Sequence, residues 1–183
     1  RLTMAGSVRL APAGAEFGGG VRAVQIGSVT ARSGAMNLLT ANSETGTVEV
    51  RRRRPAGQPF GWEDTVAQTL HIPFGPRSME LCDMNSDGWL DLVVTVRNAD
   101  RLIVFKNNNG TLEQSSQSTS GRSPREMAVA DFNEDGYKDF AVVNRESFDV
   151  SILAGGPPRG DNLASFQALD QVYGVDGSPA ALV

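Results

Sequence analysis

Short apolar runs recur along the chain, and polar or glycine-containing turns separate them. The runs at residues 92–96 and 140–143 are continuous and rich in β-branched side chains, which is typical of strands buried on both faces. No stretch of helix length spaces its apolar residues three or four apart. The pattern therefore predicts an all-β protein.

The apolar runs repeat in a fixed order. A strand that begins with a proline leads into an acidic loop, then a continuous apolar strand, a turn and a third strand. One unit has these strands at 76–82, 92–96 and 102–105, and the next has them at 124–130, 140–143 and 150–153. A degenerate unit precedes them, with strands expected at 21–27, 37–42 and 46–50. Weaker fourth strands are expected near 66–72, 112–117 and 166–172.

Four antiparallel strands per repeat of this length are typical of a β-propeller blade, which buries its faces by stacking on its neighbours. The chain is predicted to hold about three and a half blades. It would then be part of a larger propeller that missing blades or other chains complete. The expected segments are 1–17 (end of a preceding blade), 18–72 (a blade with a degenerate loop), 73–120 and 121–175 (blades with calcium loops), and 176–183 (the start of another blade).

Two acidic loops carry the clearest chemistry. Both read D-x-N-x-D-G-x-x-D, and they start 48 residues apart, at 83 and 131. Calcium takes six to eight oxygen ligands at about 2.3–2.6 Å, and alternate residues of a tight loop can point inward together. The glycine at position 6 permits the sharp turn. We expect side-chain ligands at positions 1, 3, 5 and 9, and a backbone carbonyl ligand at position 7.

The sequence thus predicts two calcium ions. The expected ligands are Asp83, Asn85, Asp87, Trp89 and Asp91 in the first loop, and Asp131, Asn133, Asp135, Tyr137 and Asp139 in the second. An EF-hand is excluded, because position 12 is Val94 or Val142 instead of glutamate and because strands flank the loops. The matching loop at 27–37 has glycine, alanine and serine at the ligand positions, so no metal is expected there. An Asx turn without metal is the alternative for each acidic loop.

The repeated units resemble FG-GAP/VCBS repeats, the blades of integrin α-subunit propellers and of many bacterial surface proteins. The resemblance rests on the two loops, the Phe-Gly pairs at 17–18 and 74–75, and the segments 109–112 and 142–152. It implies a seven-bladed parent propeller, one calcium ion per intact loop, and an extracellular, cell-surface or periplasmic setting.

Composition narrows the range of partners. The net charge is −4, and no aromatic residues interleave the basic run Arg51, Arg52, Arg53 and Arg54, so nucleic acid is not an expected partner. That run is a candidate binding site for an acidic glycan or protein, or else a solvated strand end. The single cysteine, Cys82, excludes an internal disulfide, and no apolar run is long enough to enter a membrane.

Little in the sequence points to catalysis. His71 is the only histidine and lies in a weak strand, and no nucleophile–base pair is visible. Trp62 and Trp89 would stack on sugars or serve in packing. The sequence therefore predicts that the chain is not an enzyme but a calcium-stabilised propeller module that binds protein or glycan or serves structural assembly. The alternative is an accessory propeller domain of a larger secreted enzyme or toxin.

Overall fold

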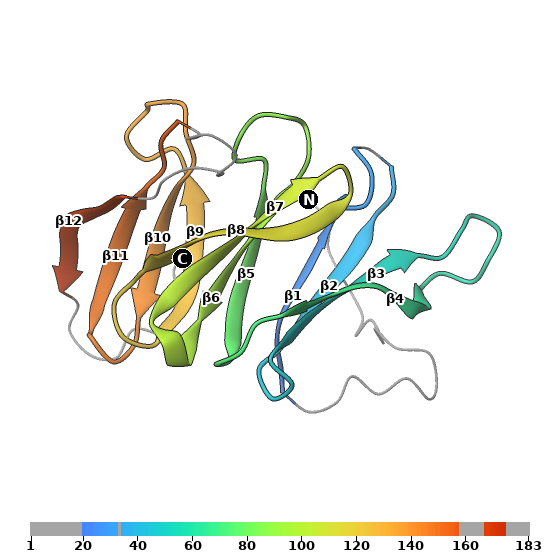
Figure 1. The fold of residues 1–183 in the computed structure, drawn as a ribbon, viewed down its shortest axis with the longest axis horizontal. Coiled ribbons are helices and arrows are strands. Elements are labelled where there is room, and N and C mark those ends of the chain that lie inside the picture. The colour runs from blue at the N-terminus through green and yellow to red at the C-terminus, as the bar shows by residue number, and fades with distance from the viewer. Residues whose placement is uncertain (1–19, 33, 158–166, 175–183) are drawn as a thin grey trace.

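The computed structural model describes residues 20–32, 34–157 and 167–174. In this part of the chain the strands form three antiparallel sheets of four strands, each in sequence order. Figure 1 shows the sheets side by side. The strands are β1 (Val21–Gly27), β2 (Asn37–Asn42), β3 (Thr47–Arg53), β4 (Trp62–His71), β5 (Pro76–Cys82), β6 (Asp91–Val96), β7 (Arg101–Asn108), β8 (Thr111–Thr119), β9 (Pro124–Ala130), β10 (Asp139–Asn144), β11 (Asp149–Ala154) and β12 (Gln167–Gly174).

The predicted fold class is confirmed: the chain is all-β and built of propeller-type, four-stranded blades. The described residues contain one short 3₁₀ turn, η1 (Arg97–Ala99), and no helix with the length and apolar character needed to span a membrane. The strands predicted least clearly are the outer ones. β4 begins at Trp62, and β8 runs to Thr119, so both exceed the expected spans.

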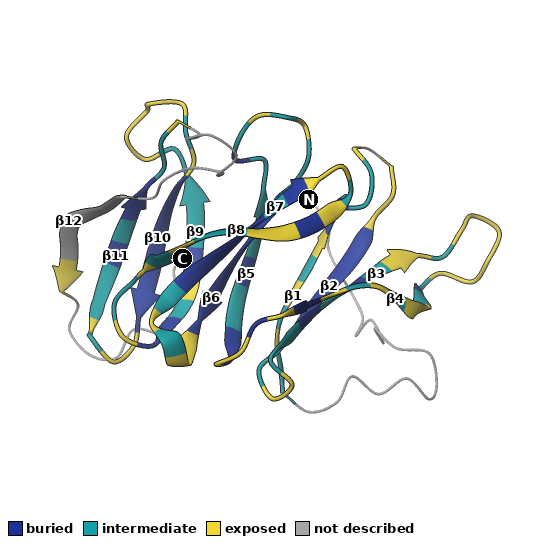
Figure 2. Cartoon of the chain, in the orientation of Figure 1, coloured by how far each residue is buried: buried dark blue, intermediate teal, exposed yellow. Residues whose placement is uncertain are grey.

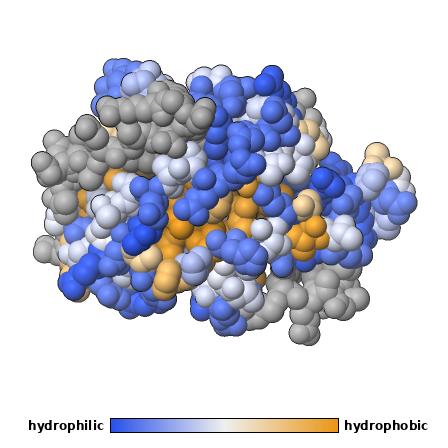
Figure 3. All heavy atoms as spheres, in the orientation of Figure 1, coloured by the Kyte–Doolittle hydropathy of each residue, from blue (hydrophilic) through white to orange (hydrophobic). Residues whose placement is uncertain are grey.

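Two apolar cores lie between the sheets. The first joins side chains of β2–β4 to those of β5–β8, and it includes the fully buried Leu39, Ile72 and Leu92. The second joins the middle sheet to the third, and it includes Val93 and Phe140. Because Leu92 and Val93 point to opposite cores, β6 must be apolar on both faces, as its unbroken run predicted. Figure 2 shows the middle strands as the most buried ones, and hydrophobic side chains appear in the middle of the face drawn in Figure 3.

The first strand of each sheet is its inner strand. β5 packs between β1 and β9, so the three inner strands lie next to one another. Gln25 on β1 donates a hydrogen bond to the Met79 carbonyl on β5 (2.8 Å), and Thr95 on β6 donates one to the Arg125 carbonyl on β9 (3.3 Å). The acidic loops connect the inner strand to the second strand in two of these sheets, between β5 and β6 and between β9 and β10. The expected half-blades at 1–17 and 176–183 and the Phe-Gly pair at 17–18 lie outside the described residues.

Candidate calcium loops and the inner-strand pocket

The first acidic loop turns its polar side chains toward its own backbone. Asp83 accepts hydrogen bonds from the N–H groups of Asp87 (3.1 Å) and Gly88 (2.8 Å). Asn85 Oδ1 accepts from Asp87 N (3.2 Å), and Asp87 accepts from Trp89 N (2.8 Å) and from the Asn85 amide (2.8 Å). Backbone φ is positive at position 4 (59°) and at Gly88 (84°), which is what bends the loop. Positions 1, 3 and 5 are thus drawn together.

The second loop repeats this network bond for bond. Asp131 accepts from Asp135 N (3.1 Å) and Gly136 N (2.8 Å), Asn133 Oδ1 accepts from Asp135 N (3.0 Å), and Asp135 accepts from Tyr137 N (2.9 Å) and the Asn133 amide (2.9 Å). The sequence match between the loops is therefore also a match in conformation.

The aspartate at position 9 of each loop is buried and joins two backbone segments through hydrogen bonds, and we call it the bracket aspartate. Asp91 is 0% exposed, and its two oxygens accept from the N–H groups of Met84 (3.0 Å) and Asn107 (2.8 Å). Asp139 is 1% exposed and accepts in the same way from Phe132 N and Gly155 N, both at 2.8 Å. Each carboxylate thus ties the start of its loop to the end of the third strand of its blade, at Asn107 in β7 and at Gly155 directly after β11. Ligation by these two residues stays a prediction, and their structural role is additional to it.

Burial raises the pKa of Asp91 to about 6, and the charges of Asp87 and Asp83 add to the rise, whereas the hydrogen bonds from Asn107 and Met84 oppose it. A raised carboxyl pKa means that the folded chain holds this proton more tightly than the unfolded chain does. The ionised carboxylate therefore costs stability at neutral pH unless a cation compensates it.

The donor chemistry of the loops suits calcium. In the part of the chain that the structure describes, no three or more His, Cys, Asp or Glu side chains are arranged together to hold a metal. Each loop instead brings together two aspartates and an asparagine, and its third aspartate faces the backbone of neighbouring strands. Carboxylate and amide oxygens are the ligands that Ca²⁺ prefers, and the backbone carbonyl at position 7 would add another oxygen. The residues present therefore fit the ion that the repeat resemblance implies.

In the degenerate loop of the first blade, a neutral asparagine takes the place of the bracket aspartate. Asn37, at the position of Asp91, is fully buried, and its Oδ1 accepts from the N–H groups of Val29 (3.0 Å) and Thr30 (3.1 Å). The Arg32 guanidinium lies 5.6 Å from the centroid of the Trp89 ring in the next loop. The worn loop thus keeps its fold with an amide in place of a carboxylate.

The arginine run predicted as a ligand site is largely engaged within its own blade. Arg51 pairs with Glu49 (2.8 Å), Arg54 lies 3.3 Å from Asp64, and the Arg53 guanidinium lies 5.6 Å from the Phe60 ring centroid. Arg52 is exposed. The role of this run in binding stays a prediction.

The histidine, the first tryptophan and the cysteine noted in the sequence lie at positions typical of structural residues. His71 is exposed at the end of β4, and Trp62 is 7% exposed in the core. Burial, together with the charges of Asp91 and Glu80, raises the pKa of the Cys82 thiol to about 12. A thiol with so high a pKa is not a nucleophile at neutral pH.

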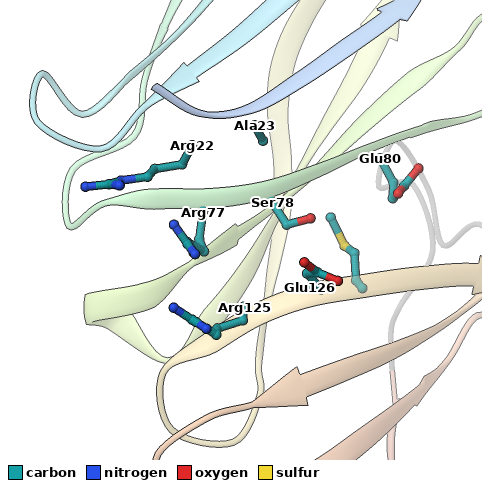
Figure 4. A pocket seen from close by; sticks show the side chains of 8 residues that line it. Arg22, Ala23, Arg77, Ser78, Glu80, Arg125 and Glu126 are labelled. Carbon is teal, nitrogen blue, oxygen red and sulfur yellow. The ribbon is translucent and has the colours of Figure 1, made fainter. Parts of the chain in front are cut away.

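The inner strands line a pocket that the sequence did not predict. It has a volume of about 200 Å³, and all of its lining residues come from β1, β5 and β9. In Figure 4 three arginines lie together on one side of it, and Glu80 and Glu126 lie on the other. The lining residues are Arg22, Ala23, Arg77, Ser78, Glu80, Arg125, Glu126 and Met127. The available signal was the recurrence of arginine at the second position of each inner strand.

Comparison with known proteins supports the repeat and the fold. Residues 83–142 match the FG-GAP-like repeat family, so the resemblance is confirmed for the segment that runs from the first loop through the second. A comparison with curated proteins found no match.

Two solved structures share the fold. One is a periplasmic gluconolactonase of Pseudomonas aeruginosa, with a TM-score of 0.57 and 22% identity, covering 79% of this chain and 38% of that one. The other is described as a putative 6-phosphogluconolactonase from Bacteroides fragilis, with a TM-score of 0.54 and 21% identity, covering 78% of this chain and 37% of that one. The chain therefore spans less than two fifths of either structure.

These structures correct one prediction. The lack of a nucleophile–base pair predicts that the chain is not an enzyme. This prediction is contradicted by the two matching structures, which are described as a lactonase and a putative lactonase. A propeller can assemble polar groups from separate blades, so the lack of a local motif does not exclude catalysis. The pocket arginines, at 22, 77 and 125, are 55 and 48 residues apart, so no local motif would reveal them.

Proposed function

We propose that these blades are a calcium-stabilised segment of a larger β-propeller. The observation that carries the proposal is the identical hydrogen-bond network of the two loops, which draws the same oxygen donors together twice. Each loop would hold one ion. The ligands would be Asp83, Asn85 and Asp87 in the first loop and the equivalent residues in the second. A divalent cation would offset the charge of aspartates that lie close together, including the buried Asp91.

Calcium bound in this way would fasten the inner strand of a blade to its second strand. An unfolded chain has no preformed site, so the binding free energy becomes folding free energy. The module would then work where free calcium is high, as outside the cell or in the periplasm. The periplasmic location of one structural neighbour supports that setting.

A second proposal concerns the whole protein that such blades complete. The matching structures favour a propeller that acts on a sugar lactone or related sugar acid, with the present blades supplying part of the wall of its site. The polar pocket at the inner strands is the place in the described chain where such a ligand would meet them. Binding of a protein or glycan partner at the blade surfaces also stays a proposal, and it rests on the sequence pattern alone.

Isothermal titration with CaCl₂ tests the calcium proposal. The chain should bind two calcium ions, and Asp131→Ala should bind one, because position 1 of the second loop is lost while the first loop is intact. The exposed Asp64→Ala, which removes a carboxylate outside the loops, is the matched control and should still bind two. Unchanged stoichiometry in Asp131→Ala, or no calcium heat in the unaltered chain, would contradict the proposal.

A further inference from the structure

Three arginines occupy one structural position in three successive blades. Arg22, Arg77 and Arg125 are each the second residue of an inner strand, in β1, β5 and β9. Because these strands are adjacent, residues far apart in sequence meet at one pocket. Because the same strand position recurs in each blade, three guanidinium groups lie close together at the inner strands.

Each of these arginines lies at an irregularity in strand pairing. Val21 and Ala23 oppose the consecutive residues Asn42 and Ala41, so Arg22 is an extra residue of β1. Arg77 is extra in the same way between Pro76 and Ser78. In β9, the pairing shifts between Pro124 and Met127, the interval that contains Arg125. Bulges redirect side chains and are frequent beside binding sites.

The arginines are poorly neutralised by the protein. Among the described residues, no carboxylate lies within ion-pair distance of the guanidinium groups of Arg22, Arg77 or Arg125. Arg22 donates from Nε to Ser43 Oγ (3.1 Å), which uses one of its five donors. Burial, followed by the charges of Arg125, Arg22 and Arg97, lowers the pKa of Arg77, and Glu126 opposes this effect. The cluster is therefore a set of neighbouring positive charges with donors to spare.

The opposite side of the pocket has different chemistry. The Ser78 hydroxyl and the carboxylates of Glu80 and Glu126 line it. Carboxylates accept hydrogen bonds from hydroxyl groups, and a serine hydroxyl both donates and accepts. A ligand that carries an anionic group at one end and hydroxyl groups at the other would match both sides.

We propose that Arg22, Arg77 and Arg125 form a binding site for a small hydroxylated organic anion, whose carboxylate or phosphate group lies among the three guanidinium groups. Arginine binds both kinds of oxyanion through paired N–H donors. The volume of about 200 Å³ accommodates a small molecule. Glu80 and Glu126 would accept hydrogen bonds from its hydroxyl groups.

This site is separate from the calcium loops. Arg77 is the second residue of β5, whereas Asp83 follows the end of that strand, and six residues of extended strand span roughly 20 Å. Loss of calcium binding and loss of anion binding are therefore distinguishable. The anion site rests on the second proposed function, a sugar-acid ligand at this pocket, and not on the calcium proposal.

The test is isothermal titration of the protein, at saturating calcium, with three six-carbon ligands that each carry several hydroxyl groups. D-gluconate carries a carboxylate, D-glucose 6-phosphate carries a phosphate, and D-glucose is neutral. We expect at least one of the anions to bind and D-glucose not to bind. Binding by only one anion would identify the preferred group. No binding by either anion, or equal binding of D-glucose, would overturn the proposal.

Variants assign the binding to the pocket. Arg77→Gln should weaken binding about tenfold or more, because a charge-assisted pair is lost. Arg77→Lys should weaken it less, since the charge stays but the paired donors do not. The matched control, Arg101→Gln, removes an arginine of β7 that does not line the pocket and should leave binding unchanged. All three should keep the calcium response of the melting temperature. Full affinity in Arg77→Gln, or equal loss in Arg101→Gln, would refute the assignment.

Discussion

Removal of calcium with EGTA is expected to lower the melting temperature by about 10–20 °C. When free calcium exceeds its Kd about 100-fold, each bound ion adds about 2.7 kcal/mol to the free energy of unfolding, so two ions add about 5 kcal/mol. For a domain of this size, each kcal/mol shifts the melting temperature by about 2–4 °C. Differential scanning fluorimetry in millimolar calcium, with and without excess EGTA, measures the shift.

The loop variant Asp83→Ala/Asp131→Ala serves as the control for this measurement. It lacks position 1 of both loops, so EGTA should leave its melting temperature unchanged. A shift of equal size in this variant would show that EGTA acts elsewhere. An unaltered chain that melts at the same temperature in EGTA and in calcium would contradict a stabilising role for the ion.

Asp91→Ala is expected to destabilise the chain by about 1–3 kcal/mol, even in EGTA, because the loss of two buried hydrogen bonds outweighs the relief of a buried charge. The substitution leaves the N–H groups of Met84 and Asn107 without their acceptor in a fully buried place. Each unsatisfied buried group costs about 1–3 kcal/mol, and the lost volume adds to this. Because folded domains are stable by only about 5–15 kcal/mol, urea denaturation at pH 7 would detect the change readily.

Two further variants separate the bracket from the ion. Asp83→Ala should lower stability in calcium but have a much smaller effect in EGTA, because the residue it replaces is less buried and lies in the loop itself. Asp91→Asn should fall between the unaltered chain and Asp91→Ala, since an amide keeps one acceptor oxygen, as Asn37 does in the first blade. If Asp91→Ala were as stable as the unaltered chain in EGTA, the bracket would have no structural role.

Much of the fold could be predicted from the sequence because the inner and middle strands obey local rules. The prolines at 76 and 124 begin β5 and β9, and β6 and β10 show the unbroken apolar runs that two buried faces require. The turn at 107–110 also follows its local signal: Asn109 and Gly110 have φ values of 52° and 99°. The outer strands were harder to delimit, since β4 and β8 are half-exposed and largely polar.

Some of the candidate functional groups could likewise be predicted from the sequence, and others could not. Loop donors within nine residues of one another are visible in sequence, because a single turn brings them together. The second function of Asp91 was not visible, since its partner Asn107 lies 16 residues away. The pocket arginines were harder still, because each is one polar residue in an inner strand. They become a cluster only when β1, β5 and β9 lie side by side.

Anomalous diffraction from crystals of the protein grown in calcium would show directly whether the loops bind the ion, because calcium scatters anomalously at long X-ray wavelengths. We expect one anomalous peak inside each acidic loop, surrounded by oxygens of Asp83, Asn85 and Asp87 in the first and of the equivalent residues in the second. Well-ordered loops with no anomalous peak in either, at a calcium concentration of several millimolar, would contradict it.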